Sequence, residues 1–255
     1  MPKTLIEQYS VSVSPLEMFF GEIFLSKGTA FFWISSGQTY LVTNWHNVTG
    51  VNPITGDNIS STGGRPNKIK FDLFIKGDLN RQITATMDLF VDDVPSWLEH
   101  PIYGRKVDVV CLQLNIPKTT EVFPINSLKK EDLQLRVGAD VFVIGYPLGL
   151  GKLPIWKRAS IATEPQLNVD DKPLIYVDTA TSSGMSGSPV IRRSEMGVLE
   201  NGDTLLGGGP SFRFIGVYSG RLVSPAGSLE AQLGFVWKAQ VIDEIINGQA
   251  RGAMP

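Results

Sequence analysis

A serine within a run of small residues is the first candidate for chemistry. Ser186 lies in the segment Ser182–Val190, in which Gly184 and Gly187 flank it. A nucleophilic serine needs backbone N–H groups turned toward one point, where they stabilise the oxyanion formed on the attacked carbonyl. Gly184 can adopt the backbone angles of such a turn without a Cβ penalty, and Gly187 keeps the approach open. The segment predicts either a nucleophile loop or a Gly/Ser-rich turn.

The chain order of the other candidates decides which catalytic design is available. The sequence holds two histidines, His46 after an apolar run and His100 beside a turn signal. No histidine follows Ser186, which excludes the order Ser, Asp or Glu, His. The order Asp, His, Ser would need His100, because no aspartate precedes His46. The order His, Asp, Ser remains, and Asp108 fits its middle position. Asp108 is flanked by valines, and a buried carboxylate must be paired.

The single cysteine, Cys111, lies in an apolar run and is expected in the core, because free cysteine behaves as a small hydrophobic residue. One cysteine permits no intrachain disulfide, which favours a reducing compartment and predicts a cytoplasmic location. One cysteine and two histidines predict no zinc site, and no metal or cofactor is expected. Residues 1–20 show no signal-peptide pattern, and no run of 18 apolar residues predicts a membrane span.

Composition narrows the classes of partner. The 255 residues suggest one large domain or two small ones. The chain has 23 Lys and Arg against 25 Asp and Glu, a net charge of −2, which predicts neither nucleic acid nor a membrane surface as partner. Hydrophobic residues make up 42% and charged residues 19%, which indicates a folded chain.

Short apolar runs separated by turn signals predict an all-β sandwich or barrel. The expected strands are 29–34, 39–43, 69–75, 83–90, 107–114, 141–146, 174–179, 190–192, 212–219 and 233–237. Helical periodicity is clear only in 238–247, and a capping-box pattern suggests a short helix at 14–17. Loops are expected at 52–68, at 117–136 as a connection between two halves, and at 194–210. Within the last loop, Asn201-Gly202 signals a hairpin turn.

Several segments, in chain order, resemble motifs of the chymotrypsin/trypsin-like serine protease family. They are GTAFF at 28–32, LVTNWHNV at 41–48, KVDVVCLQL at 106–114, VIGYPLG at 143–149, GMSGSPV at 184–190 and FIGVYSG at 214–220. GTAFF and VIGYPLG are similar to segments of the bacterial, disulfide-free HtrA-type proteases. The resemblance extends over about residues 20–247. It implies two six-stranded antiparallel β-barrels, with the active site between them and a C-terminal α-helix.

The resemblance also implies a division of the chain. Residues 1–125 are expected to form an N-terminal barrel that carries His46 and Asp108. Residues 126–255 are expected to form a C-terminal barrel that carries Ser186 and the helix. HtrA-type proteases have a peptide-binding PDZ domain after the barrels, and none is expected in this chain.

The resemblance implies a role for each candidate. Ser186 would be the nucleophile of a serine endopeptidase that works through an acyl-enzyme. His46 would be general base and then general acid, and Asp108 would orient its imidazole. The backbone N–H groups of Gly184 and Ser186 would form the oxyanion hole. Ser219 would bond the Asp108 carboxylate.

Substrate contacts follow from the same resemblance. The backbone of Ser219, Gly220 and Arg221 would pair with an extended peptide. Ala180 aligns with the base of the primary specificity pocket, and Gly234 with its opposite wall. No acid is present at that base, so the sequence favours a neutral pocket that takes an apolar or small side chain.

Two departures from the family motif matter. Met185 replaces the aspartate that captures a new N-terminus in secreted members, so we expect activity without N-terminal processing. Ser188 replaces the second glycine of the serine motif. The expected partners are a protein or peptide substrate and a regulatory protein. The alternatives are a catalytically silent double barrel that binds a peptide or protein partner, and an esterase on the same scaffold.

Overall fold

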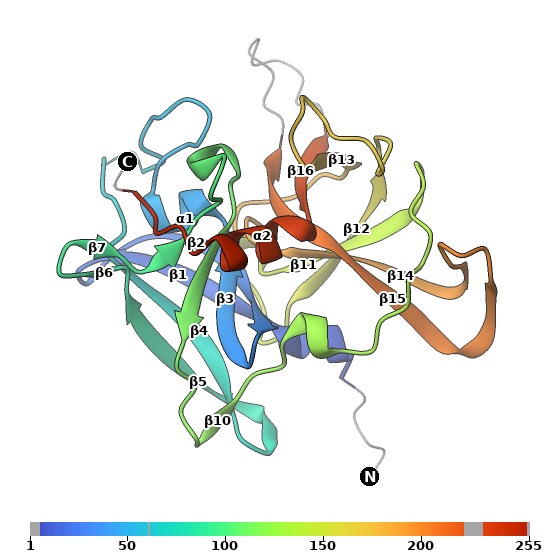
Figure 1. The fold of residues 1–255 in the computed structure, drawn as a ribbon. Helices are drawn as coiled ribbons and strands as arrows, with labels where there is room; N and C mark the ends of the chain where they lie inside the picture. The colour runs from blue at the N-terminus through green and yellow to red at the C-terminus, as the bar shows by residue number, and fades with distance from the viewer. Residues whose placement is uncertain (1–5, 61, 222–231, 254–255) are drawn as a thin grey trace.

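The computed structural model describes residues 6–60, 62–221 and 232–253. Two β-rich halves lie side by side, the N-terminal half in blue to green and the C-terminal half in yellow to orange (Figure 1). The expected all-β architecture of two halves with a C-terminal helix is confirmed.

The N-terminal half is built on one antiparallel sheet. Its strands are β1 (Val13–Phe20), β2 (Ile23–Ser35), β3 (Gln38–Thr43), β4 (Lys68–Ile75), β5 (Asp78–Asp88), β8 (Trp97–Leu98), β9 (Val110–Leu114) and β10 (Thr120–Glu121). Among the described residues this sheet is eight-stranded, in the order β10-β4-β1-β2-β3-β9-β8 with β5 on β4, where the resemblance implied six strands. A separate pair, β6 (Phe90–Val91) and β7 (Val94–Pro95), lies beside it.

The β2–β3 hairpin shows how local sequence sets this sheet. Ser36 and Gly37 both have positive φ, 50° and 78°, the combination that a two-residue turn requires for strands with a right-handed twist. The hairpin places Phe31 opposite Val42 and fixes which face of β3 enters the core.

The C-terminal half is a closed barrel. Its strands are β11 (Asp140–Gly145), β12 (Ile155–Ile161), β13 (Leu174–Asp178), β14 (Pro189–Val198), β15 (Thr204–Arg221) and β16 (Leu233–Lys238), in the order β11-β12-β13-β16-β15-β14. The expected loop at 194–210 is wrong, because β14 and β15 continue through it as a long hairpin. The turn lies at Asn201-Gly202, where the sequence placed it. The hairpin pairs Met196 with Leu206 and Ser194 with Ser211, and its register shifts between these pairs, at the glycine-rich residues 207–210.

Helices are few and short. They are α1 (Trp45–Thr49), α2 (Gln240–Gly248) and the 3₁₀ helices η1 (Gln8–Ser12), η2 (Gly104–Lys106), η3 (Ile125–Ser127) and η4 (Pro147–Gly149). The C-terminal helix confirms the periodicity of 238–247. The short helix expected at 14–17 is wrong, because those residues belong to β1 and pair with both β2 and β4.

Helix α2 follows the last strand of the closed barrel and packs against the other half. Its buried face consists of Val241, Ile242, Ile245 and Ile246, in one core cluster with Val109 and Cys111 of the N-terminal half. Figure 1 shows α2 in red, lying across the junction of the halves. After the helix, the N–H of Gly252 donates to Trp97 O (3.0 Å) and Ala250 O accepts from Glu99 N (2.9 Å). The C-terminal segment thereby adds to the edge of β8 and joins the halves.

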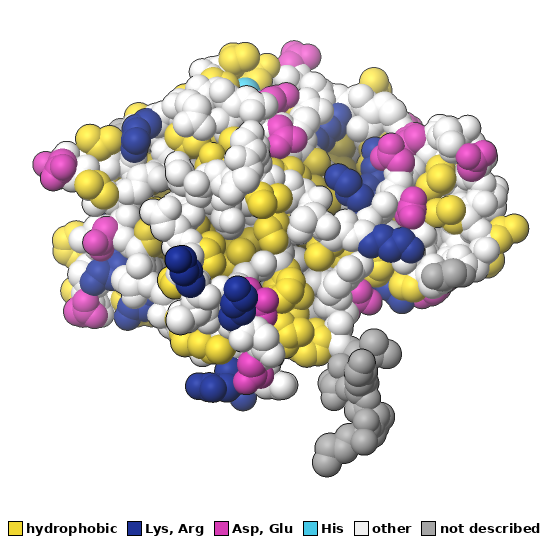
Figure 2. All heavy atoms as spheres, turned by 60° about the horizontal axis from the view of Figure 1, so that its bottom comes forward, with side chains coloured by type: hydrophobic (Ala, Val, Ile, Leu, Met, Phe, Trp, Pro, Cys, Tyr) yellow, Lys and Arg dark blue, Asp and Glu magenta, His cyan; other side chains and the backbone are white. Residues whose placement is uncertain are grey.

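The face in Figure 2 shows acidic and basic side chains interspersed, with hydrophobic side chains between them. That face therefore carries no block of a single charge. In the described part of the chain, no helix is long and apolar enough to span a membrane.

Candidate active site

His46 lies on α1, directly after β3, because the strand ends at Thr43 and a one-turn helix begins at Trp45. Gly50, at φ 69°, ends that helix in the left-handed conformation that glycine adopts without strain. The short helix turns the imidazole toward Asp108, and the distance between His46 Nδ1 and Asp108 Oδ2 is 2.6 Å. The backbone N–H of His46 also donates to Asp108 Oδ1 (2.9 Å). Both oxygens of one carboxylate therefore hold one histidine.

Asp108 is buried and well supplied with donors. The hydroxyl of Ser219 donates to its Oδ2, as the resemblance implied. Asn44, just before α1, donates from Nδ2 to the Asp108 backbone carbonyl (2.6 Å). A carboxylate that accepts from Nδ1–H fixes the imidazole tautomer and leaves Nε2 as the acceptor. No protein partner of His46 Nε2 is found among the described residues.

Ser186 lies at the turn between two glycines of positive φ, Gly184 at 95° and Gly187 at 88°. A Cβ at Gly184 would lie 2.4 Å from Tyr146 O, and one at Gly187 would lie 2.0 Å from Thr29 O. Both positions therefore require glycine on steric as well as conformational grounds. The Ser186 hydroxyl donates to Ser219 O (3.1 Å) and makes no hydrogen bond to the histidine.

The backbone around Ser186 leaves two donors available. The N–H groups of Gly184 and Ser186 donate to no backbone carbonyl or side chain within the described part of the protein. The neighbouring carbonyl of Ser183 is held elsewhere, because it accepts from Leu148 N (2.7 Å) in η4. Two free N–H groups flanking a hydroxyl can stabilise a developing oxyanion.

A polar network fastens the serine turn to the N-terminal half. Thr29 of β2 donates from its N–H to Ser186 O (2.8 Å) and from its hydroxyl to Gly184 O (2.7 Å). Asn47 of α1 donates to Ser186 O (3.2 Å), and Tyr146 N donates to the Thr29 hydroxyl (3.1 Å). Thr29 and Asn47 were not singled out from the sequence, although both lie in segments that carry the family resemblance. Polar residues inside an otherwise buried motif were the available signal.

The departures from the family motif are accommodated by packing. Met185 is buried in the core cluster of the closed barrel. Ser188 is also fully buried, and its hydroxyl lies where a side chain at Gly145 would be, 2.0 Å from that Cβ position. The hydroxyl at 188 and the glycine at 145 therefore complement each other in volume.

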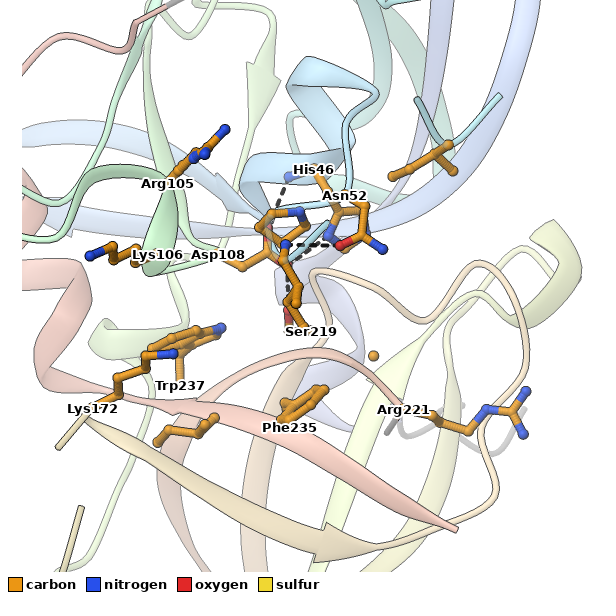
Figure 3. A pocket seen from close by; sticks show the side chains of 15 residues that line it. His46, Asn52, Arg105, Lys106, Asp108, Lys172, Ser219, Arg221, Phe235 and Trp237 are labelled. Carbon is orange, nitrogen blue, oxygen red and sulfur yellow. Dashed lines mark hydrogen bonds and ion pairs between the residues drawn. The ribbon is translucent and has the colours of Figure 1, made fainter. Parts of the chain in front are cut away.

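Two cavities lie beside these residues. The first, of about 460 Å³, is lined by His46, Ser183, Gly184 and Ser186, so histidine and serine share one solvent-accessible space. The second, of about 580 Å³, is lined by His46, by Ser219 to Arg221 at the end of β15, and by Phe235 and Trp237 of β16. Its edge carries Arg105, Lys106 and Lys172 (Figure 3).

The expected substrate-contacting residues divide into two groups. Ser219, Gly220 and Arg221 line the larger cavity and lie within reach of a bound chain. Ala180 is exposed, whereas Gly234 is buried beneath the ring of Tyr218. Neither Ala180 nor Gly234 lines either of the two cavities.

The second histidine and the single cysteine of the chain both lie outside this site. His100 is 3% exposed and bonds Glu244 of α2 through Nε2 (2.9 Å). Cys111 is fully buried, and burial raises the pKa of its thiol, so it cannot supply a thiolate nucleophile at neutral pH.

Two β-rich halves with a C-terminal helix across their junction define a protein of the double-barrel class. The sequence model of the trypsin-like peptidase domain matches residues 28–198, more than half of the 255 residues. The chain therefore belongs to the trypsin-like peptidase family, a family of serine protease hydrolases. No curated protein sequence matches it.

Solved structures of the same fold are similar at low sequence identity. The HtrA-type protease AlgW with a tripeptide is 18% identical, with a TM-score of 0.51, over 93% of this chain and 60% of that one. The chain thus spans less than two thirds of AlgW. Deg5 is 19% identical, with a TM-score of 0.52, over 93% of this chain and 87% of that one. A serine endoprotease from Yersinia pestis is 14% identical, with a TM-score of 0.51, over 94% of this chain and 64% of that one.

Proposed function

We propose that this chain is a serine endopeptidase that cleaves peptide bonds through an acyl-enzyme on Ser186. The observation that carries the proposal is the 2.6 Å contact between His46 Nδ1 and Asp108 Oδ2 beside the cavity that His46 shares with Ser186. A binding module needs neither a histidine fixed in one tautomer nor a nearby hydroxyl. A hydrolase of this family needs both.

The proposed reaction begins with a rotation of one side chain. Ser186 donates to Ser219 O in the resting structure, and rotation about its Cα–Cβ bond would turn Oγ toward His46 Nε2. Such hydrogen bonds are often long or misaligned before substrate binds and form in the complex. His46 then accepts the hydroxyl proton while Oγ attacks the substrate carbonyl. Asp108 stabilises the resulting imidazolium, which later protonates the leaving amine.

The oxyanion of the tetrahedral intermediate is proposed to bind the N–H groups of Gly184 and Ser186. Removing one donor of this type costs about 3–4 kcal/mol of transition-state stabilisation. The hydrogen bond from Leu148 N to Ser183 O supports a preformed site, because it holds that carbonyl away from the two donors. With Met185 buried where secreted members have aspartate, we propose activity without N-terminal processing.

The larger cavity is proposed to bind the substrate residues that precede the cleaved bond. The end of β15 supplies backbone from Ser219 to Arg221, and Phe235 and Trp237 supply an apolar floor. Arg105, Lys106 and Lys172 form no ion pair within the described residues, and the only acid in the lining is Asp108. Figure 3 shows Lys106 and Lys172 on the Trp237 side of the cavity. This charge favours peptides with acidic residues before the cleaved bond.

A fluorophosphonate probe tests the proposal, since it reacts only with an activated serine. We expect labelling of the wild-type chain, its loss in Ser186→Ala and its retention in Ser182→Ala, an exposed serine of the same turn. Absence of labelling in a folded wild-type protein would support the silent double barrel instead. Turnover of peptides as well as esters separates a peptidase from an esterase. The cytoplasmic location and the regulatory partner stay predictions, to be tested by fractionation and co-purification from the native host.

A further inference from the structure

Where the family resemblance implied the primary specificity pocket, an aromatic ring covers Gly234 and reaches Thr181, the residue after Ala180. Tyr218 lies on β15 directly before Ser219, and its side chain is 1% exposed. Neighbouring side chains in a strand point to opposite faces, so Ser219 reaches Asp108 while Tyr218 enters the closed barrel.

Two contacts fix the position of this ring. The Tyr218 hydroxyl and the Thr181 hydroxyl are hydrogen bonded to each other, and Thr181 lies one residue after the expected pocket base. A Cβ added at Gly234 would lie 2.4 Å from Tyr218 Cε2, so the ring covers the glycine closely. The ring is therefore in contact with the expected wall of the pocket and with the residue next to its expected base.

The backbone of Tyr218 is hydrogen bonded to the turn that carries the nucleophile. Its carbonyl accepts from Gly187 N (2.9 Å) and its N–H donates to Ser188 O (2.8 Å). These are the residues that directly follow Ser186. The backbone that carries the ring therefore cannot shift without disturbing the turn that holds the nucleophile.

The surrounding environment favours this arrangement. Burial raises the pKa of the Tyr218 phenol, so the hydroxyl is neutral at physiological pH and can be hydrogen bonded to Thr181. Met185, Val177 and Val236 belong to the same core cluster as the ring. Because its hydroxyl is hydrogen bonded and its ring is packed in the core, moving the Tyr218 side chain out of this position would cost both interactions.

We infer that Tyr218 sets the size limit for the substrate side chain at the cleaved bond, and that the enzyme takes Gly, Ala or Ser there. This inference rests on the proposed endopeptidase function. A larger side chain would have to displace a buried ring, whereas a methyl or hydroxymethyl group would require the least displacement. The sequence favoured an apolar or small residue, and the position of Tyr218 selects the small alternative.

The test is a matched peptide series that differs only in the residue before the cleaved bond: Ala, Val, Leu or Phe. For the wild-type enzyme we expect kcat/KM to favour Ala over Phe by about 100-fold or more. In Tyr218→Ala the cavity opens, and we expect the Ala-to-Phe ratio to fall at least about tenfold. Tyr218→Phe keeps the ring and should retain the wild-type ratio.

The control is Tyr9→Ala, which removes another fully buried tyrosine, one that stacks on Phe212 and lines neither of the two cavities. It should lower stability and leave the ratio unchanged. Wild-type cleavage of Leu or Phe peptides as fast as Ala peptides would overturn the inference without any variant. An unchanged ratio in a folded Tyr218→Ala that still reacts with fluorophosphonate would overturn it as well. A wild-type protein with neither labelling nor turnover would refute the proposed function itself.

Discussion

The two histidines of this chain occupy regions that look alike locally and differ in what surrounds them. His46 contacts Asp108 at 2.6 Å, and His100 contacts Glu244 at 2.9 Å. Each is therefore an imidazole with one carboxylate partner. His46 lines a cavity together with Ser186, whereas His100 is enclosed between its loop and α2.

The second ring nitrogen makes the difference. Nδ1 of His100 accepts from the backbone N–H groups of Ile102 and Tyr103, both at 3.2 Å. The lone pair of Nδ1 is thus occupied, and Nε2 of the same ring contacts Glu244. The second nitrogen of His46 has no protein partner among the described residues and adjoins a cavity. A histidine–carboxylate pair becomes a base only where its free nitrogen is left accessible.

The largest expected effect comes from removing each imidazole in turn. His46→Ala should lower kcat/KM by about 10⁴-fold or more, because the base is lost, with little change in melting temperature. His100→Ala should leave turnover near the wild-type value at 25 °C. It should lower the free energy of unfolding by about 2–4 kcal/mol, because it leaves buried donors unpaired. Peptide cleavage rates and urea denaturation measure the two effects.

The contrast fails if His100→Ala loses activity while still folded, or if His46→Ala keeps it. Either result would mean that the polar surroundings of the two rings do not determine their roles.

The carboxylates provide a second, slightly smaller contrast. Asp108→Asn should reduce kcat by about 10⁴-fold, since an amide can donate to Nδ1 and select the wrong tautomer. Glu244→Gln keeps an oxygen acceptor for His100 and is half exposed, so turnover should stay within about twofold and stability within about 1 kcal/mol. Steady-state measurement of kcat with one peptide substrate would distinguish the two variants. Equal losses in both variants would contradict the assignment.

A third variant tests whether the serine turn needs its attachment to the N-terminal half. Thr29→Val removes the hydroxyl that donates to Gly184 O (2.7 Å), so the oxyanion donors should lose their alignment and kcat should fall by about 10- to 100-fold. Thr120→Val is the matched control, because its buried hydroxyl donates to Pro117 O (2.9 Å) away from the site. Both should cost about 1–3 kcal/mol of stability. Identical kinetics in the two variants would argue that the turn is held by other contacts.

The smallest expected effect is on substrate preference, and it concerns the larger of the two cavities beside His46, which Lys106 and Lys172 line. Lys106→Glu and Lys172→Glu should each reduce the preference for acidic over neutral peptides by about three- to tenfold at low ionic strength. The difference should shrink toward 0.5 M salt, because screening weakens exposed charge interactions. Lys118→Glu, on an exposed loop, is the control. A preference that ignores both substitutions would show that the cavity charge does not select substrate.

Much of this arrangement could be predicted from the sequence, because it depends on chain order and local pattern. The absence of a histidine after Ser186 and of an aspartate before His46 left one order in which His46 could take part. The structure brings His46 next to Asp108, and both His46 and Ser186 to one cavity. The strands around them followed from short apolar runs separated by turn signals.

What could not be predicted depends on contacts between distant segments. The position of Tyr218 between Thr181 and Gly234 joins three strands or turns that are far apart in the chain. The hydrogen bonds of Thr29 to the serine turn join residues separated by more than a hundred positions. The hairpin at 194–210 looked like a loop, since its glycines have weak strand preference and only pairing with its partner strand fixes it.

The segment after α2 has a thermodynamic consequence. Because Gly252 and Ala250 bond Trp97 and Glu99, and α2 buries its apolar face against the first half, the two barrels cannot separate without losing both sets of contacts. Melting of one barrel therefore exposes the core of the other. We expect calorimetry to record one cooperative transition, with equal van't Hoff and calorimetric enthalpies, for a protein whose architecture would otherwise suggest two independent folding units.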